Sequence, residues 1–264
     1  MHSNEIARDF LELASEQRLE TILRLYLKKS KVSIIAKELD ATVPEVYRNF
    51  ERLVKSGLIE KATDGDYCLT TYGMTICNQL PSLSFVAENK KYFKNHNFGD
   101  LPQKFVQRIG ALEKSQHMKG FTKVTEQWKD TIDASNEYLY GILFEEPLEL
   151  IAPIANKAKK HVRINSIFSE STIVPKGRKQ LVDKLDFNTL IKNGLVERKM
   201  RKNVQVGVFL NEKEACVMFP TLDGEADMSE MFYSTDSFFH EWCLDYFRYC
   251  WYGSDVFQES KLKE

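Results

Sequence analysis

The sequence of 264 residues has little of several features that mark whole classes of protein. Its five cysteines include no Cys-x-x-Cys pair, and an odd number of cysteines favours free thiols in a reducing compartment over a disulfide framework. The N-terminal stretch carries His2, Glu5 and Arg8 in place of an apolar signal region, and no run of about 18 apolar residues occurs anywhere. We therefore expect a cytoplasmic protein that is neither exported nor membrane-spanning.

A strong excess of either charge is also missing, because 37 basic residues face 38 acidic ones. This balance argues against a histone-like binder, which needs clustered Lys and Arg for phosphate contacts, so any DNA-binding surface must be local. Apolar residues make up 43% of the chain and aromatic residues 12%, which is enough for packed cores. The length allows two domains of ordinary size.

The segment from Arg18 to residue 56 has the pattern of a helix-turn-helix. Residues 5–28 have the periodicity of one or two amphipathic helices, of which the better-defined one begins at Arg18, and a short helix follows over residues 33–39. Thr42 and Glu45, three residues apart, are typical of a capping box at the start of the next helix. The apolar face of this helix, over residues 43–56, comprises Val46, Phe50, Leu53 and Val54.

A β-hairpin is predicted next, because two short strand-like runs flank the Asp64-Gly65 pair, a strong signal for a two-residue turn. The three helices and this wing together predict a winged helix-turn-helix over residues 18–73. Asp64 and Asp66 lie at the tip of the wing, where acidic side chains repel phosphates. We therefore expect the wing to contact DNA only through Lys61 and its backbone.

The exposed face of helix 43–56 carries groups that can read base edges in the major groove. Arg48 can pair with guanine through two donors, and Asn49 can pair with adenine. Tyr47 and Thr42 can reach phosphates or thymine methyl groups. The DNA-binding residues predicted here are Thr42, Tyr47, Arg48, Asn49 and Arg52, with Lys37, Lys55 and Lys61 on the DNA backbone.

Part of this segment resembles winged-helix regulators of the broad archaeal and bacterial multiple-antibiotic-resistance and arsenical-resistance type. That resemblance lies in Leu53, Gly57-Leu58-Ile59, Tyr67, Leu69-Thr70 and Gly73. A second resemblance, to archaeal regulators related to the methanogenesis and filamentation regulatory protein, lies in Tyr92-Phe93, His96, Leu101-Pro102, Phe105, Arg108-Ile109-Gly110 and Leu112. The end of that family's middle domain is matched by Pro220, Asp223-Gly224, Asp227, Trp242 and Asp245 to Tyr249, although Cys243 stands where a glycine is expected.

This second resemblance implies an N-terminal winged helix and a C-terminal α/β regulatory domain in an archaeal protein. The patterns in the C-terminal half agree, since strand, helix and strand over residues 138–168 imply a parallel pair joined by a crossover. The remaining expected elements are a helix over 176–192, strands over 196–200, 204–210 and 215–219, and a helix over 237–252. We expect an α+β fold with a winged helix-turn-helix in 1–80, a helical connector in 81–130 that is interrupted at Pro81, and the α/β domain in 131–264.

An α/β domain of this size can hold an active site, yet the usual motifs are absent. The sequence contains no glycine-rich phosphate loop and no serine flanked by glycines in a nucleophile elbow. A phospholipase D half-domain, which regulators of related architecture can resemble, needs a His, a Lys two residues later and a downstream Asp. His117 and Lys119 have the first spacing, but Val124 occupies the position of the acid, and the run from His161 to Arg163 fails as well. We therefore expect no enzymatic activity and no cofactor.

A small-molecule site in the C-terminal domain is expected, because such sites are mainly apolar with a few placed polar groups. The candidate ligand-binding residues are Arg163, Arg201, Asp223 and Asp227. Residues of these types more often form a turn or a surface ion pair. His240, Cys243 and Cys250 share part of one helix face, and imidazole and thiolate suit zinc, but they do not complete a tetrahedral site. We expect them to pack in the core and to bind no metal.

The sequence thus predicts a regulator that binds specific sites on double-stranded DNA as a homodimer and senses an effector or assembles through its C-terminal domain. Two-fold symmetry would place two recognition helices over half-sites about one duplex turn apart. One alternative is an adaptor whose winged helix contacts protein, with the arginines on a solvated helix face. A hydrolase with its site in the C-terminal domain is a further alternative, weakened by the missing acid.

Overall fold

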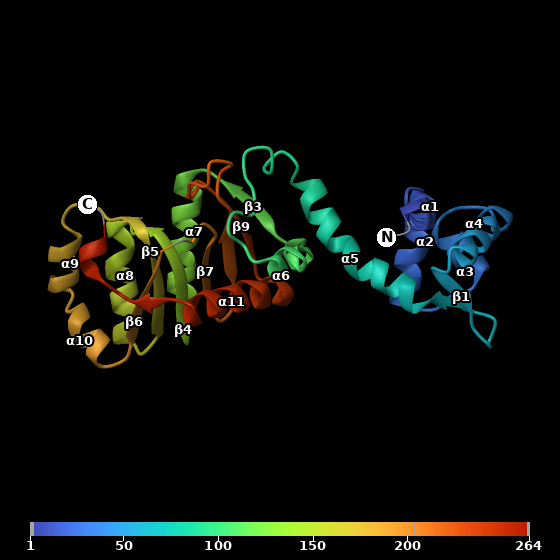
Figure 1. Ribbon diagram of the computed structural model, residues 1–264. Coiled ribbons are helices and arrows are strands. Elements are labelled where there is room, and N and C mark those ends of the chain that lie inside the picture. The colour runs from blue at the N-terminus through green and yellow to red at the C-terminus, as the bar shows by residue number, and fades with distance from the viewer. Residues whose placement is uncertain (1–2, 203, 263–264) are drawn as a thin grey trace. The chain divides into compact units, whose positions relative to one another are not determined.

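The computed structural model describes residues 3–202 and 204–262, and the chain divides into two compact units, residues 1–83 and 84–264. The first unit is a winged helix-turn-helix and the second is built on an eight-stranded sheet, so the α+β fold class expected from the sequence is confirmed (Figure 1). Within the described ranges, no helix combines the length and apolar character needed to cross a membrane.

The first unit contains four helices followed by a two-stranded wing. Its elements are α1 (Ser3–Leu13), α2 (Glu16–Leu27), α3 (Val32–Glu38), α4 (Val43–Lys55), β1 (Ile59–Lys61) and β2 (Tyr67–Leu69). The strands pair antiparallel with Glu60 opposite Cys68, and Ser30 exchanges two backbone hydrogen bonds with Tyr67 at 3.0 and 2.9 Å. The segment between α2 and α3 therefore extends the wing and fixes it to the helices.

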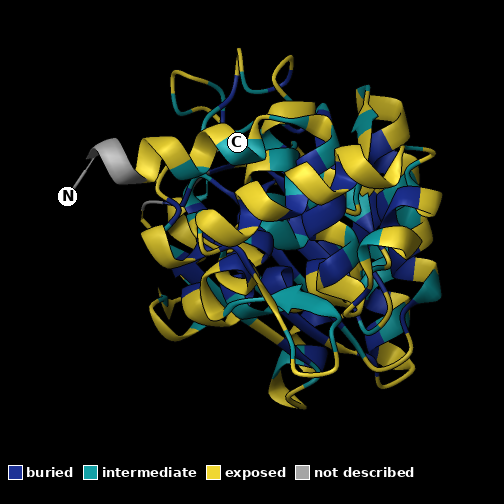
Figure 2. Cartoon of the chain, turned by 90° about the vertical axis from the view of Figure 1, so that its right-hand side faces the viewer, coloured by how far each residue is buried: buried dark blue, intermediate teal, exposed yellow. Residues whose placement is uncertain are grey.

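Helical spacing of apolar residues builds the core of this unit. Val46, Phe50 and Leu53 recur at intervals of three and four residues, which places them on one face of α4. The ring of Phe50 packs edge-on against Tyr67 with centroids 4.8 Å apart, and Ile22 and Ile35 complete the contact region. In Figure 2 the buried positions line the inner sides of the helices, while the outward-facing turns are exposed.

The expected capping box at the start of α4 is wrong. Thr42 has the extended backbone of an N-cap residue, but its side chain makes no cap hydrogen bond. Glu45 instead accepts a hydrogen bond of 3.1 Å from Nε2 of Gln17 on α2. Glu45 therefore bonds to Gln17 of another helix and not to the backbone of Thr42 in its own helix.

The expected interruption at Pro81 is also wrong, because α5 runs unbroken from Thr71 to Glu88 with Pro81 inside it. Proline removes one helical hydrogen bond and crowds the preceding turn, but Phe85, buried one turn later, keeps the helix packed beyond it. The expected helical connector spans residues 81–130, and its residues from 84 on belong to the second unit. They form the end of α5, α6 (Gln103–Val106), the short helix η1 (Ile109–Leu112), β3 (Gln116–Lys119) and most of α7 (Phe121–Ala134).

The sheet of the second unit has the strand order β10-β6-β5-β4-β7-β8-β9-β3. Its other strands are β4 (Tyr138–Glu145), β5 (Arg163–Ile173), β6 (Val196–Arg201), β7 (Gly207–Asn211), β8 (Ala215–Met218), β9 (Glu230–Ser234) and β10 (Asp255–Val256). The expected parallel pairing of β4 with β5 is confirmed, and β6 continues it, whereas the remaining neighbours pair antiparallel.

Helices cover both faces of this sheet. They are α7 with α8 (Leu148–Lys159), α9 (Arg178–Lys184) and α10 (Phe187–Lys192) on one face, and α11 (Ser237–Tyr252) on the other. Trp128 of α7 packs on Phe209 at 6.1 Å, while Tyr140 stacks on Phe247 of α11 at 4.8 Å. The single helix expected over 176–192 is split, because Asp186 adopts a left-handed backbone with φ of 59°.

Asp236 caps α11 and offers a first test of the fold. Its carboxylate accepts the backbone N–H groups of Phe238 at 3.0 Å and Phe239 at 3.3 Å. We expect Asp236→Ala to lower the free energy of unfolding by about 0.5–2 kcal/mol because two helix donors lose their partner. Urea denaturation followed by circular dichroism measures this loss. Asp236→Asn, which can accept the same bonds, should lose little, and equal losses in both variants would contradict the capping role.

Candidate nucleic-acid interface

The face of α4 opposite its core side carries Arg48 and Lys55, seven residues apart and therefore on the same side of the helix. Both are exposed, and Tyr47 beside them is 47% exposed. No hydrogen bond or ion pair of these three side chains occurs within the part of the chain that the structure describes. The face can therefore meet a ligand without first breaking an internal contact.

Two other residues of the expected DNA-reading set have partners inside the protein. Arg52 makes a bidentate ion pair with Glu12 of α1, with both N–O distances at 2.9 Å. Asn49 donates its side-chain amide to Gln17 of α2. The hydrogen bond with Glu12 raises the pKa of Arg52. Asn49 therefore lies on the flank of α4 that faces α2, whereas Arg52, one turn after Arg48, shares the side of Arg48 and is held by its contact with α1.

The rest of the expected set surrounds α4. Thr42 is exposed at the start of this helix, and Lys37 is exposed in the last turn of α3. Lys61 ends β1, and its ammonium lies 5.9 Å from the ring centroid of Tyr67. The structure thus places these residues on three consecutive elements, each open to solvent.

The acidic tip of the wing is partly neutralised by Lys29, a residue that the sequence did not single out. Its ammonium pairs with the Asp64 carboxylate, which also accepts the backbone N–H of Asp66 at 3.2 Å. The hydrogen bond from Lys29 lowers the pKa of Asp64. The wing therefore presents less uncompensated negative charge than its sequence indicates. Lys29 and Asp64 are 35 residues apart, so local spacing gives no signal of the pair.

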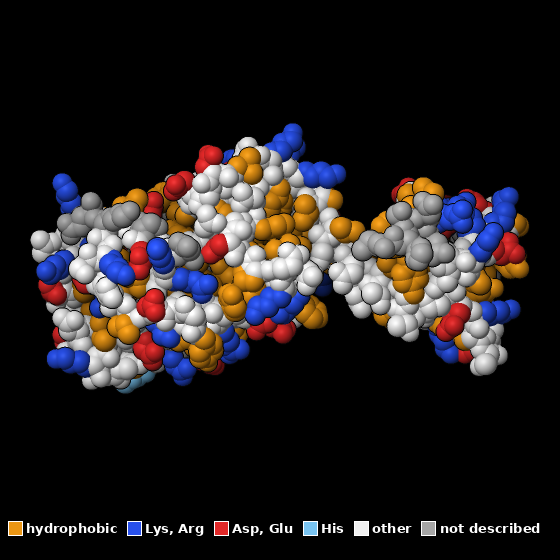
Figure 3. Space-filling model, in the orientation of Figure 1, with side chains coloured by type: hydrophobic (Ala, Val, Ile, Leu, Met, Phe, Trp, Pro, Cys, Tyr) orange, Lys and Arg blue, Asp and Glu red, His pale blue; other side chains and the backbone are white. Residues whose placement is uncertain are grey.

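Charge is mixed over the surface as a whole. In Figure 3, basic and acidic side chains are interspersed on the visible face of each unit. A protein with 37 basic and 38 acidic residues has no global attraction to phosphates. A DNA contact would depend on the few exposed cations of α4 and its neighbours.

The structure does not bring the four candidate ligand-binding residues of the second unit together. Arg163 begins β5 and Arg201 ends the neighbouring parallel strand β6, so the two residues lie at opposite ends of this strand pair. Asp223 is exposed in the loop between β8 and β9 and lines an open hollow of about 420 Å³. The Arg201 guanidinium donates to the carbonyl of Cys250 at 3.4 Å.

Asp227 has a structural partner in His96, whose side chain is 5% exposed. The carboxylate lies 2.9 Å from Nε2 of His96, and Nδ1 of that ring lies 3.0 Å from the carbonyl of Tyr92. Burial raises the pKa of Asp227, but hydrogen bonds from Ser229 and His96 outweigh it, so the net shift is downward. These contacts tie the segment after α5 to the loop before β9.

The fragment of a phospholipase D motif lies at the edge of the sheet. His117 and Lys119 both reach Glu230, with Nε2 to Oε2 at 2.9 Å and Nζ to Oε1 at 2.5 Å. Val124, at the position of the missing acid, is fully buried in α7. The two basic residues therefore contact a largely buried carboxylate of β9 in place of the acid that the motif requires.

The helix face suspected of suiting zinc packs into the protein. Nε2 of His240 lies 2.7 Å from the carbonyl oxygen of Asn211 and 3.2 Å from the hydroxyl of Tyr138. Burial raises the pKa of Cys250 to about 11 and that of Cys243 well above its usual range. A thiol held neutral in this way is a poor metal ligand and a poor nucleophile.

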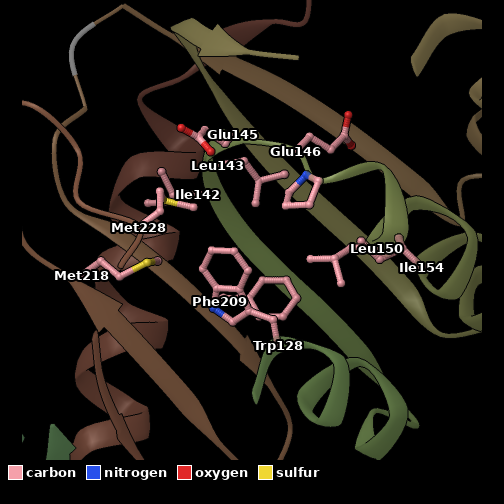
Figure 4. Close-up of a pocket in the computed structure, with 11 residues that line it drawn as sticks. Trp128, Ile142, Leu143, Glu145, Glu146, Leu150, Ile154, Phe209, Met218 and Met228 are labelled. Carbon is pink, nitrogen blue, oxygen red and sulfur yellow. The ribbon is translucent and has the colours of Figure 1, made fainter. Parts of the chain in front are cut away.

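An apolar pocket lies between α7, α8 and the sheet (Figure 4). Trp128 and Phe209 line one end, and the carboxylates of Glu145 and Glu146 lie at the other. Its open volume is about 20 Å³, which is the room that one water molecule requires. A larger ligand would therefore have to displace side chains such as Met228.

Comparisons with known proteins add three distant structural likenesses. No family model and no curated protein matches the sequence. TrmBL2, an archaeal chromatin protein, is 11% identical with a TM-score of 0.42, over 92% of this chain and 94% of its own. NucT from Helicobacter pylori is 12% identical with a TM-score of 0.42, over 55% of this chain and 99% of its own. IdeR from T. acidophilum is 14% identical with a TM-score of 0.24, over 84% and 98%. Scores below 0.5 establish no shared family, so function is argued from the residues of this chain.

Proposed function

We propose that the protein is a DNA-binding transcriptional regulator that docks α4 in the major groove of double-stranded DNA. The observation that carries this proposal is the exposed, unpaired triad of Tyr47, Arg48 and Lys55 on the second helix of a helix-turn-helix. The guanidinium of Arg48 on such a helix can bond both acceptors of a guanine edge. The ammonium of Lys55, two helical turns further on, can reach a phosphate.

The contacts of Asn49 and Arg52 narrow the reading face. Arg48 becomes the leading base-reading residue, and Lys37, Lys55 and Lys61 are assigned to the DNA backbone. Arg52 is 54% exposed although Glu12 is only 16% exposed, and Glu12 keeps a second partner in Arg18 at 2.9 Å. Arg52 can therefore exchange Glu12 for a phosphate on binding, while Asn49 has a more enclosed partner in Gln17 and is a weaker candidate for base contact.

The proposed regulator is a homodimer whose second unit senses an effector or mediates assembly. Exposed apolar side chains in the first unit supply material for contact with a second copy, since Leu27 is 83% exposed and Leu11 is 64% exposed. A dimer would place two copies of α4 over half-sites about one duplex turn apart. The stoichiometry of the DNA complex, measured by light scattering, reports this assembly.

Substituting Arg48 and Lys55 tests the proposal. Fluorescence anisotropy of the full chain on duplexes from its own promoter should show an affinity that falls with salt, with a log–log slope of about −0.9 per phosphate neutralised. We expect Arg48→Ala to weaken binding by about 1–3 kcal/mol and to relax base preference. Lys55→Ala should weaken binding to all duplexes alike and reduce the salt slope by about one.

Lys123→Ala is the matched control, because Lys123 is an exposed lysine on α7 of the second unit. It should leave the titration unchanged. Micromolar or weaker affinity of the wild-type protein for every duplex would overturn the regulator. If DNA binding survives the combined substitution of Arg48 and Lys55, the exposed side of α4 is not the DNA-binding surface. If that double variant keeps DNA binding but loses a protein partner, the result favours the adaptor.

A further inference from the structure

A fully buried arginine lies beside the C-terminal segment of the second unit. Arg178 is 2% exposed, and its guanidinium pairs with two carboxylates, Glu146 at the end of β4 and Glu259 near the C-terminus. Its planar group also lies 5.8 Å from the ring centroid of Phe168. A side chain buried to this degree and paired with two carboxylates holds its planar donors in fixed directions.

Arg198 of β6 faces the same carboxylate. Its NH1 lies 3.4 Å from Oε2 of Glu259, while Oε1 of Glu259 accepts from Arg178. Burial lowers the pKa of Arg198, and the Glu259 carboxylate counteracts that effect. Each oxygen of one carboxylate thus meets a different arginine, and charge-assisted bonds of this kind are those by which arginine binds other carboxylates and phosphates.

The carboxylate that fills this arginine pair belongs to a lightly attached segment. Glu259 is 47% exposed, and the two-residue strand β10 that precedes it lies at the edge of the sheet. The segment is further held by the ring of Phe257 over Arg198 at 4.2 Å and by the ion pair of Lys261 with Glu170. Most residues of this segment are exposed, in contrast to the buried arginine beneath them, so its contacts are ones that local opening can break.

Space for a ligand adjoins the pair on both sides. An enclosed void of about 20 Å³ touches Arg178, Arg198 and Ser166 from within. An open hollow of about 370 Å³ borders Arg178, Lys179 and Glu259 from outside. With Glu259 displaced, two guanidiniums face the single carboxylate of Glu146, and Lys179 adds a third cation at the rim. The site then attracts an anion.

We propose that Arg178 and Arg198 form a binding site for an oxyanion, a carboxylate or phosphate group of a small molecule, which Glu259 of the C-terminal segment occupies in its absence. Binding exchanges one carboxylate for another oxyanion and releases residues 254–262 from the edge of the sheet. The site lies wholly within the second unit, and its existence does not depend on whether the first unit binds DNA.

Calorimetric titration of the full-length protein with inorganic phosphate tests the site, and acetate serves as the carboxylate probe. Glu259→Gln removes the competing charge and keeps the side-chain shape, so we expect phosphate to bind this variant at least about 10-fold more tightly than the wild type. Adding Arg198→Gln to Glu259→Gln should remove that gain. Preference for phosphate would identify a phosphate-bearing ligand, and competition by acetate would identify a carboxylate.

Arg163→Gln is the matched control in the Glu259→Gln background, because Arg163 is an exposed arginine at the start of the neighbouring strand β5, three residues before the Ser166 that pairs with Arg198. It should leave phosphate affinity unchanged. In the wild type, saturating phosphate should speed amide hydrogen exchange in β10, which a merely structural ion pair would not do. Arg198→Lys keeps the positive charge, and it is the variant to use if Arg198→Gln does not fold. Absence of saturable binding of either anion to Glu259→Gln, or equal affinity with and without Arg198, would overturn the site.

Discussion

Phe50→Ala should lower the free energy of unfolding of the first unit by about 3–5 kcal/mol. Phe50 is fully buried on α4, so truncation to alanine leaves a cavity between α4 and the Tyr67 ring of the wing. A unit of about 80 residues has little stability to spare. We expect the variant to lose DNA binding because the helix that carries Arg48 no longer has a core to hold it.

The three tryptophans of the chain allow each unit to be followed separately. Trp128, Trp242 and Trp251 all lie in the second unit. In a urea titration of Phe50→Ala, circular dichroism should show an early transition, while tryptophan fluorescence should keep its wild-type midpoint. Phe10→Ala, an exposed position on α1, is the control and should change neither signal. A fluorescence midpoint that moves with the early transition would show that the two units unfold together.

The winged helix could be predicted from the sequence because its signals are local. The spacing of Val46, Phe50 and Leu53 defines one helical face, and Asp64-Gly65 defines the turn, without reference to distant residues. The final helix was placed with its observed bounds, Ser237–Tyr252, for the same reason. Sequence periodicity fixes such elements when one face is buried and the ends carry their own signals.

The elements that were missed depend on partners far along the chain. Strand β3 is four residues long and gains its ladder only from β9, more than a hundred residues later. The helix α7 was hidden in an expected connector, although Gly120 before it has a φ of 110°, a conformation that favours glycine and marks a break in the chain. Asp186 ends a helix that periodicity alone would continue.

The candidate sites show the same division. The helical pattern puts Arg48 on the side of α4 away from its apolar face, and in the structure Arg48 is exposed, as is Lys55. The partners of Asn49 and Arg52 lie 32 and 40 residues away, so the sequence could not show that these two side chains are engaged. The arginine site was missed altogether, because Arg178 and Glu259 are 81 residues apart and meet only through the folded sheet.

Arg178→Ala should destabilise the second unit by about 3–5 kcal/mol, because it leaves the partly buried carboxylate of Glu146 without its partner. The loss should far exceed that of Lys179→Ala, a neighbouring exposed lysine that serves as control. Urea denaturation followed by tryptophan fluorescence measures both variants. The double variant Arg178→Met with Glu146→Leu should recover much of the stability, since apolar side chains of similar volume need no counter-charge.

Recovery of folding without recovery of oxyanion binding would separate two roles of Arg178. In the double variant the second unit is stable, yet the guanidinium that fixes one ligand oxygen is absent, so adding Glu259→Gln should no longer raise phosphate affinity. A loss below about 1 kcal/mol for Arg178→Ala would contradict the buried pair, because surface substitutions usually cost about 0.5 kcal/mol or less. A buried charge is costly unless it is paired. Arg178 has one carboxylate from Glu146 and a second from Glu259, which belongs to a displaceable segment. When that segment leaves, a bound oxyanion can supply the second negative charge.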